Sequence, residues 1–224
     1  MLNNQELAKY IDHTLLRPGV EETEVVETCR EAREFGFKTV CVSLDSLPVA
    51  VRELKGSEVL PIAVIGFPVG NEATPEKIRQ TQRACELGAR EIDMVINRTL
   101  LSAKKYAEVV QDIRAVVESA QGVPVKVILE TCELSDEMKV IACALSVAAG
   151  ASFVKTSTGF STGGATAEDV ALMRRVVGPQ VGVKASGGIR DRETADKMIA
   201  AGASRLGCSA SVAIVKGETS TSSY

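Results

Sequence analysis

The sequence predicts one α/β domain folded as a single (β/α)8 TIM barrel with a short N-terminal helix. Three observations support this prediction. Short runs rich in β-branched residues alternate with longer amphipathic stretches along the chain. We count eight such runs, and strands that alternate with helices pair in parallel. No GxGxxG turn follows the first run, which disfavours the competing architecture, an open doubly wound sheet.

The eight predicted strands are short and bounded by polar or glycine-containing turns. In chain order they are Tyr10–Leu15, Lys38–Ser43, Ile62–Gly66, Glu91–Asn97, Val125–Glu130, Phe153–Thr156, Val181–Ser186 and Arg205–Cys208. Most of them are followed by a stretch with apolar residues at helical spacing. These predicted helices are Glu21–Phe35, Thr74–Leu87, Leu100–Ser119, Ser135–Ala149, Thr166–Val177, Asp191–Ala201 and Ser209–Val215.

Local signals mark where several of these helices begin and end. Thr74 is followed by Pro75, a residue favoured in the first turn, and Ser135 and Thr166 are good N-caps. A Gly-Ala pair closes three of the helices shortly before the next strand. The barrel is therefore expected to span residues 1–215, and the polar segment 216–224 is expected to be a flexible tail.

Composition excludes several classes of function. The chain has 224 residues, 45% of them hydrophobic and 25% charged, as is usual for soluble globular proteins. A net charge of −3 gives no electrostatic footprint for nucleic acid, and no apolar run is long enough to span a membrane. The N-terminus has no features of a signal peptide. We therefore expect a cytoplasmic protein with neither nucleic acid nor membrane as a partner.

Cysteine and histidine usage bears on metal binding. Six cysteines are present, none in a CxxC pair, and His13 is the single histidine. A zinc site of familiar spacing is therefore not expected, and the cysteines are expected to be reduced thiols. We expect neither a metal nor another cofactor.

Charged residues are predicted to point into the barrel. Alternate residues of a strand share a face. In several predicted strands one face is charged and the other is apolar, and we expect the apolar face to pack against the helices. The predicted inward set contains three acids and three lysines, namely Asp12, Asp93, Glu130, Lys126, Lys155 and Lys184. Thr14 shares the face of Asp12, whereas His13 has the opposite parity and is given no catalytic role.

These buried charges have two interpretations. They could form salt bridges that only hold the barrel together, and for Lys126 both interpretations stay open. For Asp93, Lys155 and Lys184, catalysis is favoured, because two inward lysines on adjacent strands would lower the pKa of one of them. A lysine with a lowered pKa is an effective nucleophile toward carbonyl carbon at neutral pH. Parity does not decide which lysine is the nucleophile.

Five motifs then resemble a known family along the whole chain. IDHTLL, EIDMVIN, FVKTSTGF, VKASGGIR and GASRLG occur in the order found in the deoxyribose-phosphate aldolase family. The resemblance implies a class I aldolase on a (β/α)8 barrel without a metal. Such enzymes cleave 2-deoxy-D-ribose 5-phosphate reversibly to D-glyceraldehyde 3-phosphate and acetaldehyde, in the catabolism of deoxyribonucleosides. It also implies a homo-oligomer, a dimer or a tetramer.

The resemblance also assigns roles to individual residues. The lysine of KTSTG, Lys155, is implied to form the Schiff base, and Asp93 and Lys184 are implied to donate and accept protons. A supporting part in the proton network is expected for Asp12, Thr14, Cys41 and Lys126. Ordinary packing is an equally good interpretation for Cys41.

A phosphate site is predicted in the loops after the last two strands. Barrels commonly bind phosphate there, and glycines allow backbone N–H groups to approach the anion. The residues expected to bind phosphate are Gly187, Gly188, Gly207 and Ser209. Family members usually have a second serine where this chain has Ala210. Members also often end in tyrosine, as here at Tyr224, which could reach the site or belong to a mobile end.

Two rival functions remain. One is another lysine aldolase or a transaldolase on the same fold, which would need different polar residues for a more hydroxylated donor. The other is a catalytically inactive phosphate-binding barrel, which the intact trio of Asp93, Lys155 and Lys184 argues against.

Overall fold

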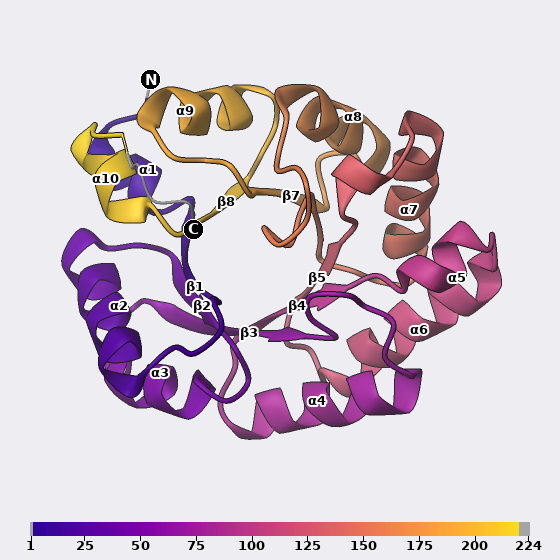
Figure 1. The fold of residues 1–224 in the computed structure, drawn as a ribbon, viewed down its shortest axis with the longest axis horizontal. Helices are drawn as coiled ribbons and strands as arrows, with labels where there is room; N and C mark the ends of the chain where they lie inside the picture. The colour runs from indigo at the N-terminus through magenta and orange to yellow at the C-terminus, as the bar shows by residue number, and fades with distance from the viewer. Residues whose placement is uncertain (1, 220–224) are drawn as a thin grey trace.

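A computed structural model describes residues 2–219 as a closed barrel of parallel strands inside a ring of helices (Figure 1). The strands pair in chain order, and the last strand pairs with the first. They are β1 Ile11–Leu15, β2 Thr39–Val42, β3 Leu60–Ile65, β4 Glu91–Val95, β5 Val125–Ile128, β6 Phe153–Lys155, β7 Gly182–Ser186 and β8 Arg205–Cys208. The predicted (β/α)8 barrel is confirmed.

The helices lie outside the barrel and connect successive strands (Figure 1). They are α1 Asn4–Ala8, α2 Glu22–Phe35, α3 Leu47–Glu53, α4 Thr74–Glu86, α5 Arg98–Ser102, α6 Tyr106–Ser119, α7 Asp136–Ala148, α8 Ala167–Val177, α9 Arg192–Ala200 and α10 Ser211–Lys216. The expected short N-terminal helix is α1, whose N-cap Asn3 and Glu6 form a capping box.

Two helical segments differ from the predictions. No helix is predicted between β2 and β3, yet α3 lies there, with Pro48 in its first turn, where a missing N–H costs nothing. The single helix predicted over Leu100–Ser119 is two helices, α5 and α6. Lys104 between them adopts a positive φ of 57°, which breaks the helical path.

The hydrophobic core lies between the strands and the surrounding helices. Outward-facing strand residues such as Met94, Val154 and Val183 are completely buried in this layer. The helices contribute apolar residues from one face, for example Val109 and Ile113 of α6. Most apolar side chains therefore pack outside the sheet, and the inner face of the barrel holds the charged residues beside a small apolar cluster of Cys41, Ile62 and Val64.

The register of the sheet sets neighbouring charges at the same height. Lys155 of β6 is paired with Lys184 of β7, and Lys184 is paired with Arg205 of β8. On the two strands that precede β6, Asp93 of β4 is paired with Lys126 of β5. These pairings bring residues far apart in the sequence together in the barrel interior.

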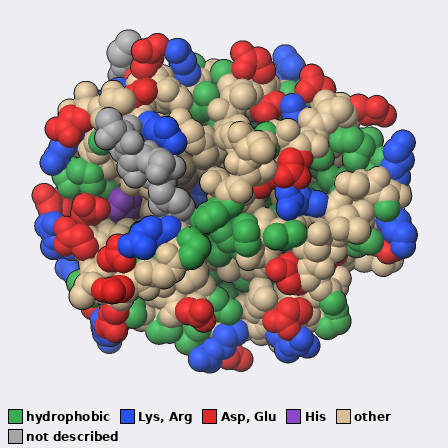
Figure 2. All heavy atoms as spheres, viewed as in Figure 1, with side chains coloured by type: hydrophobic (Ala, Val, Ile, Leu, Met, Phe, Trp, Pro, Cys, Tyr) green, Lys and Arg blue, Asp and Glu red, His purple; other side chains and the backbone are tan. Residues whose placement is uncertain are grey.

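The surface has mixed charge, and acidic and basic side chains alternate around the rim of helices (Figure 2). Within residues 2–219, no helix is both long and apolar enough to cross a membrane. The predicted tail, residues 216–224, is only partly covered by the structure, and its flexibility stays a prediction. Tyr224 lies outside the described residues.

Candidate active site

Asp93 is the centre of the charged cluster inside the barrel. Its Oδ2 atom lies 2.8 Å from the Nζ atoms of both Lys155 and Lys184, and its Oδ1 atom accepts from Lys126 at 2.8 Å. All four side chains are almost completely buried. The structure thus brings together the three residues that the sequence analysis placed in the chemistry, and it adds Lys126 to the same carboxylate.

Asp12 lies on the other side of Lys184. Its Oδ2 atom is 2.5 Å from the Nζ of Lys184, and its Oδ1 accepts from Thr39 at 2.7 Å and from Arg205 at 2.8 Å. The carboxylate is fully buried. Its surroundings are those of an ionised group, because each contact is with a cation or a hydroxyl donor.

Two members of the cluster, Glu91 and Arg205, were missed by the sequence analysis. The guanidinium of Arg205 contacts both Glu91 oxygens, at 3.0 and 3.3 Å, and Lys126 Nζ lies 2.6 Å from Glu91 Oε2. Strand parity could have found them, because Glu91 is two residues before Asp93 and Arg205 is two residues before Gly207. Both occupy the first position of a strand, at the end of the barrel away from the carboxyl ends.

Glu130 does not belong to this cluster, which corrects the predicted balance of three acids and three lysines. Strand β5 ends at Ile128, and Glu130 follows it with a left-handed backbone, φ 60°. Its carboxylate accepts from the backbone N–H of Thr158 at 3.2 Å and from the Thr158 hydroxyl. Glu130 therefore secures the loop after β6 instead of pairing with the inward lysines.

The two central lysines have opposite pKa shifts. Burial lowers the pKa of Lys155 below its ordinary value, Asp93 opposes this, and Lys184 adds to it. Burial acts on Lys184 in the same direction, but Asp12 and Asp93 outweigh it and raise the pKa of that amine. Lys155 is therefore the amine that gives up its proton more readily, whereas Lys184 stays an ammonium group.

The carboxyl groups stay ionised despite their burial. Burial alone would raise the pKa of Asp93, but Lys126, Lys155 and Lys184 hold it well below its ordinary value. The pKa of Asp12 is also lowered, since Lys184, Lys126 and Arg205 together outweigh its desolvation. At neutral pH the site therefore holds a proton acceptor, the Asp93 carboxylate, and a proton donor, the Lys184 ammonium group. Both lie next to Lys155, the amine that can become neutral.

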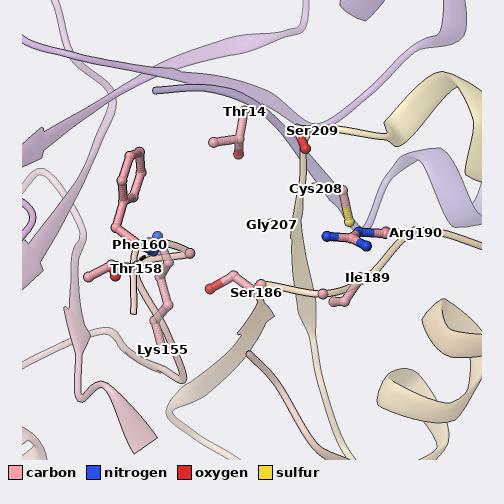
Figure 3. A pocket seen from close by; sticks show the side chains of 13 residues that line it. Thr14, Lys155, Thr158, Phe160, Ser186, Ile189, Arg190, Gly207, Cys208 and Ser209 are labelled. Carbon is pink, nitrogen blue, oxygen red and sulfur yellow. Dashed lines mark hydrogen bonds between the residues drawn. The ribbon is translucent and has the colours of Figure 1, made fainter. Parts of the chain in front are cut away.

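A cavity of about 120 Å³ opens beside Lys155. It lies among the loops that follow β6, β7 and β8, and Figure 3 shows Lys155, Ser186 and Thr14 directed toward it from different strands. The lining residues are Thr14, Lys155, Thr158, Gly159, Phe160, Ser186, Gly187, Gly188, Ile189, Arg190, Gly207, Cys208 and Ser209. A small molecule in this cavity would meet the Lys155 amine.

All four residues predicted to bind phosphate line the cavity. Gly187 and Gly188 have positive φ values of 83° and 77°, a backbone conformation that side chains disfavour. Arg190, the last residue of the VKASGGIR motif, also lines the cavity and is not among the predicted site residues. Its guanidinium lies beside Cys208 in Figure 3, and Arg190 makes no hydrogen bond or ion pair with the other described residues. Ala210 is not among the lining residues.

Gly207 allows Lys184 to cross the barrel. A Cβ atom at this position would lie 2.9 Å from Lys184 Cε and 2.9 Å from Ser186 Cβ, closer than real side chains approach. Gly182 gives similar room to the ring of Phe153, which would lie 2.1 Å from an added Cβ. A side chain at position 207 would therefore force Lys184 or Ser186 to move.

The remaining predicted residues fall at the edge of the cluster. The Thr14 hydroxyl donates to the backbone oxygen of Asp12 at 2.9 Å and lines the cavity. Cys41 is fully buried against Ile62 and Val64, and burial raises the pKa of its thiol to about 11. Cys41 is thus a protonated thiol between a small apolar cluster and the charged groups Asp93, Lys155 and Lys184.

His13 points away from the cluster, as its parity predicts. Its ring nitrogens lie 2.9 Å from Ser211 Oγ and 2.9 Å from Glu31 Oε2, in the layer between the sheet and the helices. As to metals, the described residues contain no group of three or more His, Cys, Asp or Glu side chains arranged to hold an ion.

Comparisons with known proteins agree with one another. The model of the DeoC/LacD family of aldolases matches residues 7–216. The deoxyribose-phosphate aldolase of Streptococcus sanguinis is 54% identical over 219 residues, which cover 98% of this chain and 100% of that protein. The deoxyribose-phosphate aldolase of Bacillus cytotoxicus is 56% identical over 210 residues, 93% of this chain and 94% of that protein.

A solved structure is similar over nearly the whole barrel. It is described as a unique tetrameric structure of deoxyribose phosphate aldolase from Aeropyrum pernix. The TM-score is 0.89 at 33% sequence identity, covering 96% of this chain and 91% of that one. Both the sequence and the fold are therefore similar to those of aldolases along almost their full length.

Proposed function

The chain belongs to the DeoC/LacD family of aldolases, and from that premise we propose that it reversibly cleaves 2-deoxy-D-ribose 5-phosphate to D-glyceraldehyde 3-phosphate and acetaldehyde. The observation that carries this proposal is the position of the Lys155 amine. It lies at the cavity, its pKa is lowered, and Asp93 joins it to Lys184. An amine in this setting can form a Schiff base with an aldehyde.

In the proposed reaction, the neutral Lys155 amine attacks C1 of the open-chain sugar, and water leaves to give an iminium. As the C2–C3 bond breaks, its electron pair forms the C1=C2 bond of an enamine, and the π electron pair of the C=N bond moves to the nitrogen. The C3 hydroxyl loses its proton at the same time, and glyceraldehyde 3-phosphate departs. Protonation of the resulting enamine at C2 and hydrolysis release acetaldehyde and restore the amine.

We assign the proton transfers to Asp93 and Lys184. The Asp93 carboxylate is the acceptor that can take the C3 proton, through a bridging water, and the Lys184 ammonium is the donor that can return a proton to the enamine. Both groups lie at the Lys155 amine, and their pKa shifts favour these charge states. Asp12, Thr14 and Lys126 support them by holding the network in place.

We propose that the substrate phosphate binds on the far side of the cavity from Lys155. The support is the loop glycines Gly187, Gly188 and Gly207, together with Ser209, since backbone N–H groups and a hydroxyl are common phosphate ligands. Arg190 adds a cation at the same place. A deoxyribose 5-phosphate bound in this way extends from the phosphate loops to the lysine.

We also propose that the enzyme forms a homo-oligomer, a dimer or a tetramer, and works in the cytoplasm without nucleic acid. The support for an oligomer is the relative from Aeropyrum pernix, which is described as tetrameric. The support for a reducing compartment is that all six cysteines are free thiols, four of them buried. Light scattering after size-exclusion chromatography measures the oligomeric state directly.

Acetaldehyde release tests the substrate assignment. Purified enzyme is incubated with 2-deoxy-D-ribose 5-phosphate, and acetaldehyde is measured by its reduction with alcohol dehydrogenase and NADH. We expect rapid release from the phosphate ester and slow release from unphosphorylated deoxyribose. A protein that releases no acetaldehyde, yet acts on a more hydroxylated sugar phosphate, would be a different lysine aldolase or a transaldolase.

A further inference from the structure

The ion pairs inside the barrel form a closed ring of alternating charge. Successive members contact one another through side-chain nitrogen and oxygen atoms at 2.5–3.0 Å. In order around the ring they are Arg205, Glu91, Lys126, Asp93, Lys184 and Asp12, and the last contacts the first. Three carboxylates alternate with three cations, so the fully ionised ring has no net charge.

Lys155 lies outside this ring. Among the described residues its amine pairs with Asp93 alone, and that carboxylate already serves Lys126 and Lys184. A protonated Lys155 is therefore a surplus positive charge in a buried and otherwise balanced cluster, which disfavours the protonated form. The balance holds only while every member of the ring keeps its charge.

Glu91 and Arg205 complete the ring at the end of the barrel away from the cavity. Each is the first residue of its strand, and neither lines the cavity. Arg205 connects to Lys155 by two routes, one through Asp12 and Lys184 and the other through Glu91 and Lys126. Both routes end at Asp93, the partner of Lys155.

We propose that Glu91 and Arg205 are positioning residues that set the pH at which Lys155 loses its proton, acting through the ring that joins them to Asp93. This inference rests on the proposed role of Lys155 as the Schiff-base amine. Removing the negative charge of Glu91 makes deprotonation of Lys155 easier. Removing the positive charge of Arg205 makes it harder. A residue that only holds the barrel together would have no such signed effect.

The strand register gives the size of the effect. The Cα atoms of Lys155, Lys184 and Arg205 are paired on three successive strands, which places the Cα atoms of Lys155 and Arg205 about 10 Å apart. One charge at that distance, at the effective dielectric constant found for buried protein sites, shifts a titration midpoint by about one pH unit. A shift of that size is easy to measure.

The other charged or titratable groups around Lys155 stay the same in these variants. They are Asp12 of β1, Cys41 of β2, Asp93 of β4, Lys126 of β5, Glu130 after β5, Lys184 of β7, Arg190 after β7 and Cys208 of β8. Strand β3 faces the same interior with Ile62 and Val64, which do not titrate. The change at Glu91 or Arg205 is therefore the single altered charge.

The experiment measures how trapping of Lys155 depends on pH. Enzyme and acetaldehyde are mixed at a series of pH values and reduced briefly with borohydride, and the adduct on Lys155 is quantified by peptide mass. We expect the midpoint to fall by about one pH unit in Glu91→Gln and to rise by about the same amount in Arg205→Met. The double variant removes one charge of each sign and should return close to the wild-type midpoint.

Two controls separate the electrostatic effect from damage to the fold. Arg205→Lys keeps the charge while losing the two-pronged contact with Glu91, and it should keep the wild-type midpoint. Asp112→Asn breaks a different buried ion pair, with Lys77, where the two charged atoms lie 2.7 Å apart. It should reduce stability without moving the midpoint. If Arg205→Met does not fold, Glu91→Gln, which is nearly isosteric, decides the matter alone.

The outcomes distinguish this inference from the proposed function. An adduct on Lys155 whose midpoint stays at the wild-type pH in Glu91→Gln, or moves in the same direction in both single variants, would overturn the inference alone. The absence of any adduct on wild-type Lys155 would overturn the proposed function, and the inference would fall with it.

Discussion

Lys155 and Lys184 occupy paired positions on β6 and β7, and both amines lie 2.8 Å from the same oxygen atom of one carboxylate. Their chemical roles nevertheless differ, because Lys184 has a second carboxylate partner, Asp12, and Lys155 has none among the described residues. The second carboxylate keeps Lys184 charged. Because Lys155 has no second carboxylate among the described residues, it is the amine that can become neutral and attack a carbonyl carbon.

Replacing Asp93 tests the shared carboxylate. Asp93→Asn leaves three buried lysine amines without their common anion, and we expect a loss of stability of roughly 3–5 kcal/mol. We also expect kcat to fall by about 10²–10⁴, because the proton acceptor is lost. Urea unfolding and the acetaldehyde assay measure the two effects. The matched control is Asp112→Asn, and an equal loss of kcat in that variant would show that Asp93 matters only for folding.

Crowding Lys184 tests its position independently of its charge. Gly207→Ala places a Cβ atom 2.9 Å from Lys184 Cε, so the amine must move. We expect kcat to fall about 10- to 100-fold for both phosphorylated and unphosphorylated deoxyribose. Gly182→Ala, which crowds the Phe153 ring instead, should reduce stability with little loss of kcat. A defect confined to the phosphorylated substrate would mean that Gly207 acts on phosphate binding.

The phosphate loops can be tested with a pair of neighbouring substitutions. Ser209→Ala removes a hydroxyl from the cavity wall, and we expect KM for deoxyribose 5-phosphate to rise roughly 10-fold, with no change for deoxyribose. Ala210→Ser should leave KM close to its wild-type value, because Ala210 does not line the cavity. If Ala210→Ser lowers KM markedly, the phosphate extends further toward α10 than the cavity indicates.

The lowered carboxyl pKa values predict sensitivity to acid. Asp12 and Asp93 have folded-state pKa values below their ordinary value of 3.8, so the unfolded chain binds more protons as the pH falls below about 4. Their contribution to stability is complete above that pH and is lost progressively below it. Urea unfolding between pH 7 and pH 2 should show the free energy of unfolding falling in this range. Asp12→Asn should show a shallower fall, and an unchanged slope would contradict the assignment.

Much of the barrel follows from local sequence patterns. The spacing of apolar residues predicts the alternation of strands and helices. The alternation of side chains along each strand was enough to predict Asp93, Lys155 and Lys184 on the inner face. Helix α3 was not predicted because a proline usually marks the end of a helix. Pro48 lies in the first turn of α3, where proline is tolerated. Glu130 was misplaced since nothing local showed that the strand stops at Ile128.

The ring of charges could not be predicted from any single strand. Each of its contacts joins residues on different strands, so it depends on register and barrel closure. Arg205 illustrates this, because its contact with Asp12 exists only once β8 lies beside β1. The choice between Lys155 and Lys184 has the same origin, since the partner that distinguishes them, Asp12, comes from β1.

Trapping of the Schiff base identifies the amine that attacks the carbonyl carbon. Wild-type enzyme is incubated with acetaldehyde, reduced with borohydride and digested, and the modified peptide is identified by mass. We predict one reduced adduct, on Lys155, which disappears in Lys155→Ala and persists in Lys126→Met. An adduct on Lys184 or Lys126 in the wild-type enzyme would contradict the account.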